Sequence, residues 1–274
     1  ATLFADLGKK VTIVEMMPSI LFGNDTEICE TAADLLTNHG VQIHTGAKVL
    51  EIRDGLTCVF EKDGQMLSAE GDVVVIAAGR KPDTAALGLS AAGVAVDTRG
   101  FVQVDDEMRT NVPNIFAIGD ITGKQQLAHV ATAQGVVAAH NAAGEHRAMD
   151  YSAVPGCIYT TPEIACVGLS EEKAIEVGYK IKVGRFDVSG NGRSLAIGSQ
   201  EGFVKLVTDE ETGRILGCHI ISAYATEMIS EMAMAIRYGL TVDQVGETIH
   251  PHPTVSEIIM EAAHDTEGLC CHKL

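Results

Sequence analysis

The sequence predicts an α/β protein in which a partial parallel-sheet unit and a central segment precede an α+β domain with an antiparallel sheet. Its 274 residues exceed what one hydrophobic core usually fills, so two or three domains are expected. Helix and buried-strand patterns alternate over residues 1–80, which indicates a parallel sheet. From Tyr151, short strands follow one another between glycine-rich turns, as in an antiparallel sheet. The expected domains span residues 1–80, 81–150 and 151–274.

Composition excludes several classes of protein. The net charge of -17 and the lack of clustered Lys and Arg argue against a nucleic-acid partner. No apolar run reaches the roughly 20 residues that cross a bilayer, so no membrane span is expected. The seven cysteines are odd in number and lack CxxC spacing, which favours buried thiols in a reducing compartment and no zinc site.

The first elements resemble the interior of a dinucleotide-binding Rossmann unit. Residues 1–8 read as the second half of an amphipathic helix that ends at Gly8. The buried-type strand 9–15 then ends in Glu15. In a Rossmann unit, a glycine-rich turn precedes the helix, and an acid about 20 residues further on binds the adenosine ribose. That turn would fall just before Ala1, so we expect a fragment without its phosphate-binding loop.

The next segments continue the alternation. Apolar residues at helical spacing predict a helix over 25–39, followed by a strand over 41–44. Residues 47–52 and 57–60 predict a hairpin that turns at Asp54-Gly55.

A fully buried strand is expected over Asp72–Ala78, and it ends at Gly79. A glycine at the carboxyl end of such a strand lets the backbone approach a ligand, although a structural turn explains it equally well.

The central segment has a second apolar strand that ends in a glycine and an acid. A strand is expected over 101–104. A second, apolar strand is expected over 115–118, and Gly119-Asp120 follows directly at its end. The carboxylate of Asp120 suits a polyhydroxy ligand, but the signal is weak by itself. Residues 127–139 predict an alanine-rich helix whose first N–H groups suit an anion or an electron-rich ring. His129, in its first turn, is by itself more typical of a satisfied, partly buried histidine.

The last domain is expected to hold an antiparallel sheet and two helices. Its strands are expected at 166–168, 180–186, 202–208 and 215–221, and its helices at 225–238 and 256–264.

Between these helices, His252 and Glu257 lie five residues apart at the start of the second one. An imidazole with a carboxylate on its second nitrogen is an acid–base pair that works near neutral pH. The alternative is structural, because Thr254-x-x-Glu257 before an apolar run is also a capping box.

Six motifs together resemble one known family. They occur in this order: VTIVE, VVVIAAGRKP, NVPNIFAIGD, LAHVA, YTTPEIACVG and HPHPTVSE. They are similar to the flavin-dependent pyridine nucleotide–disulfide oxidoreductases, most closely to the members that oxidise dihydrolipoamide. The resemblance runs the whole length of the chain. Single motifs are unspecific, but six in this order are not.

The resemblance implies roles for particular residues. It implies that Glu15 holds the adenosine ribose of NAD, with Val49 and Gly79 lining the same site. It implies that Asp120 contacts FAD on its ribityl or phosphate side. The stretch near the flavin ring would be Gln126, Leu127, Ala128 and His129. His252 would be the proton acceptor, oriented by Glu257, with His250 a neighbour of uncertain role.

The resemblance also implies a reaction and partners. Protein-bound dihydrolipoamide would be oxidised through an enzyme disulfide and FAD, with reduction of NAD. The implied partners are a second copy of the chain, as a twofold homodimer, and the lipoyl domain of a 2-oxo acid dehydrogenase or glycine cleavage complex. The implied location is the cytoplasm, or the mitochondrial matrix in a eukaryote.

The chain departs from the family in lacking the redox-active cysteine pair and both glycine fingerprints. This fragment is therefore expected to be inactive by itself. Three alternatives stay open: a glutathione reductase-like enzyme, a mercuric reductase-like enzyme, suggested by Cys270-Cys271, and a flavin-free dimerisation module. Glu15 favours NAD over NADP, because an acid repels a 2′-phosphate.

Overall fold

The computed structural model describes residues 1–272 and divides into two compact units. One unit comprises Ala1–Val74 together with Ser152–Leu274, and the other comprises Val75–Tyr151. The sequence-based division into three domains stays a prediction, and the last two positions of its third domain lie outside the described residues.

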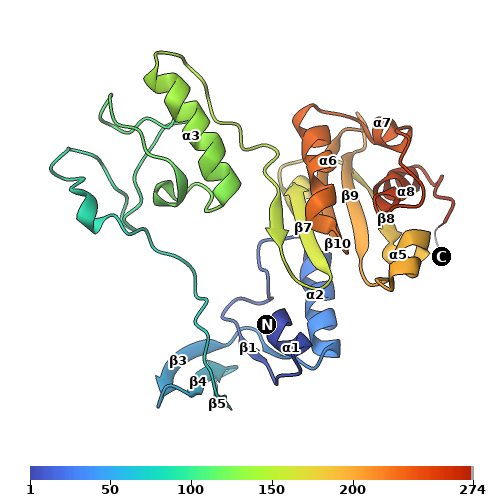
Figure 1. Cartoon of the computed structure of the whole chain (residues 1–274), viewed down its shortest axis with the longest axis horizontal. Helices are drawn as coiled ribbons and strands as arrows, with labels where there is room; N and C mark the ends of the chain where they lie inside the picture. Colours follow the sequence, from blue (N-terminus) through green and yellow to red (C-terminus); the bar gives the residue numbers. More distant parts are fainter. Residues whose placement is uncertain (273–274) are drawn as a thin grey trace. The chain divides into compact units, whose positions relative to one another are not determined.

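The first unit begins with the expected helix–strand alternation (Figure 1). Its elements are α1 (Thr2–Asp6), β1 (Thr12–Val14), α2 (Thr26–Asn38) and β2 (Gln42–His44). The strands β1 and β2 pair in parallel, which confirms the predicted connection through a helix. Helix α2 begins where the sequence predicted, because the Asp25 carboxylate accepts the Glu27 N–H at 3.1 Å.

A three-stranded antiparallel sheet follows, with the order β3-β4-β5. Its strands are β3 (Lys48–Arg53), β4 (Thr57–Lys62) and β5 (Gln65–Glu70). The predicted hairpin is confirmed: Asp54 and Gly55 have φ angles of 51° and 75°, as the turn between right-twisted strands requires. The third strand was not predicted.

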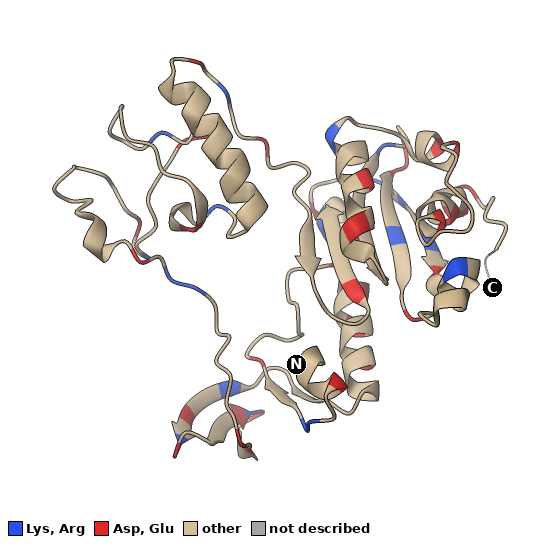
Figure 2. Ribbon diagram, viewed as in Figure 1, with Lys and Arg blue, Asp and Glu red and all other residues tan. Residues whose placement is uncertain are grey.

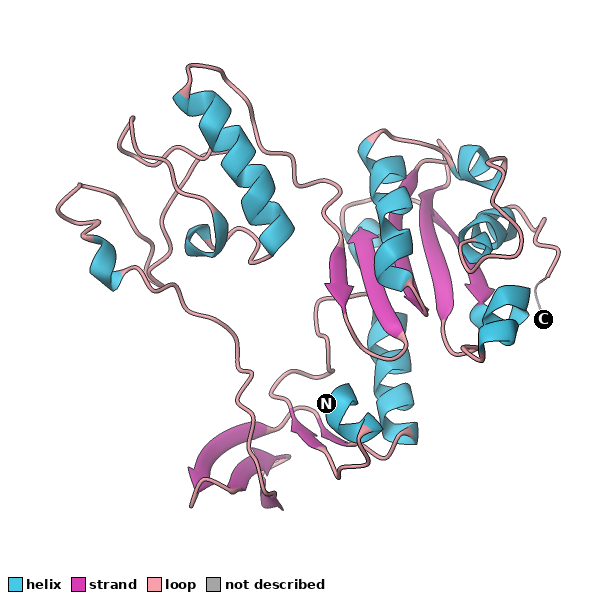
Figure 3. Cartoon of the chain, viewed as in Figure 1, coloured by secondary structure: helices cyan, strands magenta, loops and turns pink. Residues whose placement is uncertain are grey.

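The carboxyl-terminal part of the same unit contains a five-stranded antiparallel sheet, with the order β6-β7-β10-β9-β8 (Figure 3). The strands are β6 (Gly156–Ile158), β7 (Glu163–Gly168), β8 (Ile181–Asp187), β9 (Phe203–Asp209) and β10 (Ile215–Ser222). The two predicted helices are α6 (Ala225–Arg237) and α8 (Glu257–Thr266). Three short helices were missed: α4 (Glu171–Glu176), α5 (Gly192–Ile197) and α7 (Val242–Gly246).

Helices cover both faces of this sheet. Val204 and Leu206 of β9 share a core with Ile229 of α6 and Ile258 of α8. The opposite face buries residues that alternate with these along the strands, among them Phe203, which packs in one cluster with α2. This two-sided burial explains why nearly every residue of β9 is buried.

The second unit contains one long helix, α3 (Ala128–Ala142), and two short 3₁₀ helices, η1 (Ala85–Leu87) and η2 (Gly119–Thr122). Its small core contains Val94, Val102 and Ala117. The predicted strands are reduced to single bridges here, Val96 with Val102 and Arg109 with Phe116.

The prediction of a buried strand over Asp72–Ala78 is wrong for this structure. The segment has no assigned strand, and Val73, Val75 and Ile76 are exposed. The physical reason is that no strand within residues 1–272 pairs with it, and a lone extended segment has neither ladder hydrogen bonds nor a packed face.

Within residues 1–272, no helix has the length and apolar character needed to cross a membrane.

Candidate functional site

His252 and Glu257 form a direct hydrogen bond. His252 Nδ1 lies 2.8 Å from Glu257 Oε1. The His252 side chain is 79% exposed, whereas the Glu257 side chain is only 16% exposed. Since Nδ1 faces the carboxylate, Nε2 is the nitrogen that remains for exchanging a proton with another molecule.

Glu257 also makes one of the two hydrogen bonds of the predicted capping box. Its second oxygen, Oε2, accepts the backbone N–H of Thr254 at 2.7 Å. The other half is absent, because the Thr254 hydroxyl donates to the Pro251 carbonyl and the N-cap residue of α8, Ser256, makes no side-chain cap bond. The structural and acid–base interpretations of Glu257 are therefore compatible: one oxygen fixes the loop and the other faces the imidazole.

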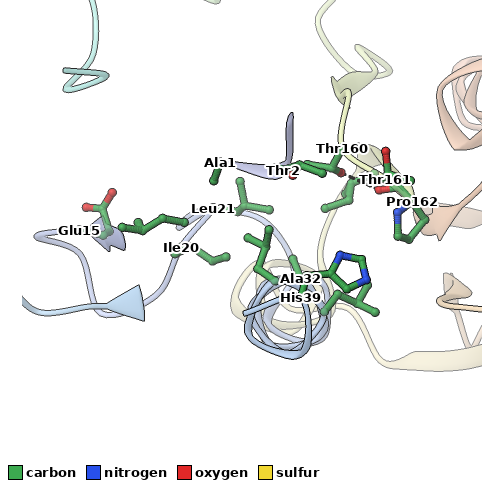
Figure 4. A pocket seen from close by; sticks show the side chains of 14 residues that line it. Ala1, Thr2, Glu15, Ile20, Leu21, Ala32, His39, Thr160, Thr161 and Pro162 are labelled. Carbon is green, nitrogen blue, oxygen red and sulfur yellow. Dashed lines mark hydrogen bonds between the residues drawn. The ribbon is translucent and has the colours of Figure 1, made fainter. Parts of the chain in front are cut away.

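Glu15 lies directly after β1, beside a hollow of about 260 Å³ (Figure 4). Its backbone N–H donates to the His44 carbonyl at 2.8 Å, and its Oε1 accepts the Met17 N–H at 2.7 Å. Apolar side chains of β1 and α2, including Ile13 and Leu35, line the hollow. The carboxylate is thus held at the carboxyl end of a parallel strand, where ligands of such sheets bind.

The other two residues expected around NAD, Val49 and Gly79, belong to different units of the structure. Val49 lies on β3, is exposed, and is not among the residues that line this hollow. Gly79 belongs to the second unit and has a φ of 96°, a conformation that favours glycine. No heavy atom lies within 4 Å of a Cβ placed there, so both a turn and a ligand approach fit this glycine.

In the second unit, the structure does bring the residues expected near FAD onto neighbouring elements. Asp120 lies in η2, and the stretch Gln126–His129 leads into α3, which packs against η2. The Gly119 N–H donates to Gln134 Oε1 at 2.6 Å, which ties η2 to the middle of α3. The N-cap residue Leu127 makes no side-chain cap bond, so the first N–H groups of α3 keep their capacity to donate. His129 is exposed rather than partly buried.

Arg80 is a residue of this region that the sequence interpretation missed. Its Nη1 lies 3.1 Å from Asp120 Oδ2, and both side chains are substantially exposed. The available signal was its position directly after Gly79, at the end of an apolar stretch.

Two observations test whether this region fits a polyhydroxy, phosphate-bearing cofactor. The buried Oε1 of Gln125 has no hydrogen-bond partner among the described residues. The Asp120 side chain is about half exposed, and an ionised carboxylate has the capacity to accept hydrogen bonds from hydroxyl groups. With the N-terminus of α3, the donor and acceptor set fits such a group.

The described cysteines are all free thiols. Burial raises the pKa of Cys166 to about 12 and raises that of Cys218 well above its usual value. These two are therefore not nucleophiles at neutral pH. No group of three or more His, Cys, Asp and Glu within residues 1–272 is arranged to hold a metal ion.

Comparison with known proteins identifies two family domains in the chain. Residues 1–135 match the pyridine nucleotide-disulphide oxidoreductase domain. Residues 154–263 match the pyridine nucleotide-disulphide oxidoreductase dimerisation domain.

Similar proteins include the dihydrolipoyl dehydrogenase of Chlamydia pneumoniae, which is 44% identical over 96% of this chain and 57% of its own length. That of Thermus scotoductus is 43% identical over 98% of this chain and 59% of its own length. A solved structure, the HOCl-induced flavoprotein disulfide reductase RclA from Escherichia coli, superposes with a TM-score of 0.86 at 30% identity, covering 98% of this chain and 61% of its own. The chain therefore spans a little under two thirds of the length of these proteins.

Proposed function

We propose, given that this chain belongs to the pyridine nucleotide-disulphide oxidoreductase family, that it supplies the proton-handling part of a dihydrolipoyl dehydrogenase. The matched relatives of this name are 40 to 44% identical to the chain over the aligned residues. The observation that carries the proposal is the hydrogen bond between His252 and Glu257, with the imidazole exposed.

The chemistry required of this pair is removal of a proton from a thiol. The free thiols of dihydrolipoamide have a pKa of about 8.5, so few are thiolate at neutral pH, and only the thiolate attacks a disulfide efficiently. His252 Nε2 takes the thiol proton, and the resulting imidazolium is held against Glu257. The two electrons of the substrate pass by way of an enzyme disulfide outside this chain, and bound FAD and NAD supply the transfer chemistry.

The cofactor assignments follow the residues present. Asp120 and the stretch Gln126–His129 are proposed to hold FAD, with Arg80 as a further neighbour of the Asp120 carboxylate. Glu15 is proposed to accept hydrogen bonds from the adenosine ribose of NAD, with Val49 and Gly79 near it in the complete protein.

The proposed partners are a second copy of the parent protein and a lipoyl domain of a 2-oxo acid dehydrogenase or glycine cleavage complex. The matched dimerisation domain supports the first. The exposure of His252 is compatible with it, because the family resemblance implies that the dyad of one subunit completes the active site of the other. The proposed location is the cytoplasm, or the mitochondrial matrix in a eukaryote.

The decisive experiment is lipoamide-dependent NAD reduction by the full-length parent protein. Activity with lipoamide but not with glutathione or mercuric ion is the expected result. Activity with glutathione or mercuric ion alone would assign another branch of the family. A purified chain that dimerises without flavin absorbance, from a parent with no reductase activity, would favour a dimerisation module.

A further inference from the structure

The loop that contains His252 holds a second histidine, His250, which also pairs with a carboxylate, that of Glu231. His250 Nε2 lies 3.1 Å from Glu231 Oε1, and His250 Nδ1 lies 2.8 Å from the Thr248 carbonyl oxygen. The His250 side chain is only 4% exposed. Glu231 belongs to α6, whose first half carries acidic residues, drawn red in Figure 2, and it lies 19 residues before His250.

The geometry fixes the charge of His250. A neutral imidazole has one N–H, so it donates from one nitrogen only. Here both nitrogens face oxygens that only accept, a backbone carbonyl and a carboxylate. Both bonds form only when the ring is an imidazolium. The Glu231 hydrogen bond also raises the pKa of His250.

The position of His250 shows which part of the chain the His250–Glu231 pair holds in place. Residues 247–256 connect α7 to α8, and the first seven of them, 247–253, are exposed except for His250. The next anchor along the chain is the Thr254 N–H bond to Glu257. His252, with its exposed ring, lies between these two anchors.

We propose that Glu231 and His250 are positioning residues, a buried ionic clamp that holds the His252 loop so that its Nδ1 stays aligned with Glu257. The proposal rests on the proposed function for its consequence in turnover, but the clamp itself is a property of this chain. Pinning the backbone two residues before His252 limits the rotation of a ring whose side chain is 79% exposed.

The first test uses the purified chain and needs no enzyme activity. Glu231→Gln removes the carboxylate charge while keeping its shape. Glu227→Gln is the matched control, because Glu227 lies one turn earlier on α6 and is exposed. We expect hydrogen-exchange protection factors of the Thr254 amide to fall about tenfold or more in Glu231→Gln only. The ring ¹⁵N shifts of His252 should also show a mixture of tautomers. Glu231→Asp should restore both signals in part.

Equal protection and equal His252 ring signals in Glu231→Gln and Glu227→Gln would overturn the clamp. Should Glu231→Gln not fold, the unmodified chain gives the same test through pH. The charged groups that face His250 are Glu231 of α6 and Glu257 of α8. As pH rises through the raised pKa of His250, the ring loses one donor, so the Thr254 protection factor should fall as the His250 ring titrates. A protection factor that stays constant through that titration would contradict the proposal.

The consequence for catalysis is measured separately in the full-length parent. There, Glu231→Gln should lower kcat with lipoamide about tenfold and leave KM nearly unchanged. If hydrogen exchange shows the clamp but the full-length parent has no lipoamide activity, the clamp inference stands and the proposed function is refuted.

Discussion

Lys205 of β9 and Asp25, the N-cap of α2, form a buried ion pair. The distance from Lys205 Nζ to Asp25 Oδ1 is 2.7 Å, and the two side chains are 4% and 0% exposed. Glu27 and Glu171 also face the ammonium group, at 3.2 and 3.1 Å. One lysine therefore holds together three carboxylates from α2 and from the start of α4, and it fixes the amino-terminal segment on the five-stranded sheet.

Replacing Lys205 with Met should destabilise the chain strongly. The aliphatic stem is kept, but three carboxylates lose their shared cation and the buried Asp25 keeps no ammonium partner. Removing one partner of a buried pair typically costs about 3 kcal/mol or more in the free energy of unfolding. Urea unfolding measures this loss. Lys182→Met is the control, because Lys182 pairs with Glu267 at the surface and its loss should change stability little.

His219 should make stability fall as the solution becomes acidic. The ring is buried on β10, and this burial lowers the pKa of His219 below its usual value. The unfolded chain then binds a proton that the folded chain does not, so the folded state loses stability as pH falls below about 6.5. Urea unfolding at pH 7.5 and 5 should show this loss, and His219→Gln should make it smaller. An unchanged difference in His219→Gln would assign the pH dependence to other groups.

His252→Gln in the full-length parent should lower lipoamide-dependent turnover about a hundredfold or more. Flavin content should stay the same, because His252 hydrogen-bonds to Glu257 and belongs to a different unit from Asp120, the residue proposed to hold FAD. His146→Gln offers a matched control, since His146 is an exposed histidine that also pairs with a glutamate. Turnover near that of the unmodified enzyme would remove His252 from the mechanism.

Much of the fold was predictable because its signals are local. Asp25 before an apolar helix, and Asp54-Gly55 between alternating strands, carry their own hydrogen-bonding and φ requirements. The strand over Asp72–Ala78 could not be predicted reliably from its own residues. A β-strand forms only when it pairs with another strand, and the apolar residues of this segment do not show whether a pairing strand is present.

The candidate site was predictable to the same extent. His252 and Glu257 are five residues apart, a spacing that fits both this contact and a capping box, and the resemblance to the family favours the contact. The contact of His250 with Glu231 joins a loop to a helix 19 residues earlier, and no periodicity points to it. The burial of Lys205 was equally hidden, because a lysine in a strand is normally an exposed position.

The exposed apolar segment should be the first site of proteolysis in this chain. Val73, Val75 and Ile76 are extended and exposed, and no described strand protects their backbone. Brief digestion with elastase, followed by intact-mass analysis, should give cleavage between residues 72 and 79 before any cut in the sheets. First cleavage inside β9 or β10 would contradict the structure.

Glu15→Arg in the full-length parent should shift cofactor preference towards NADP. The carboxylate lies at the end of β1, where it is proposed to accept hydroxyl hydrogen bonds of an adenosine ribose and where its charge would repel a 2′-phosphate. An arginine there removes the repulsion and adds a donor for the phosphate, so the ratio of kcat/KM for NADP to that for NAD should rise about tenfold or more. Glu51→Arg is the control, since Glu51 is an exposed acid on β3 and its replacement by arginine changes the charge by the same amount. An equal ratio in both variants would show that Glu15 does not face the ribose, and would leave the hollow beside β1 without a role in cofactor selection.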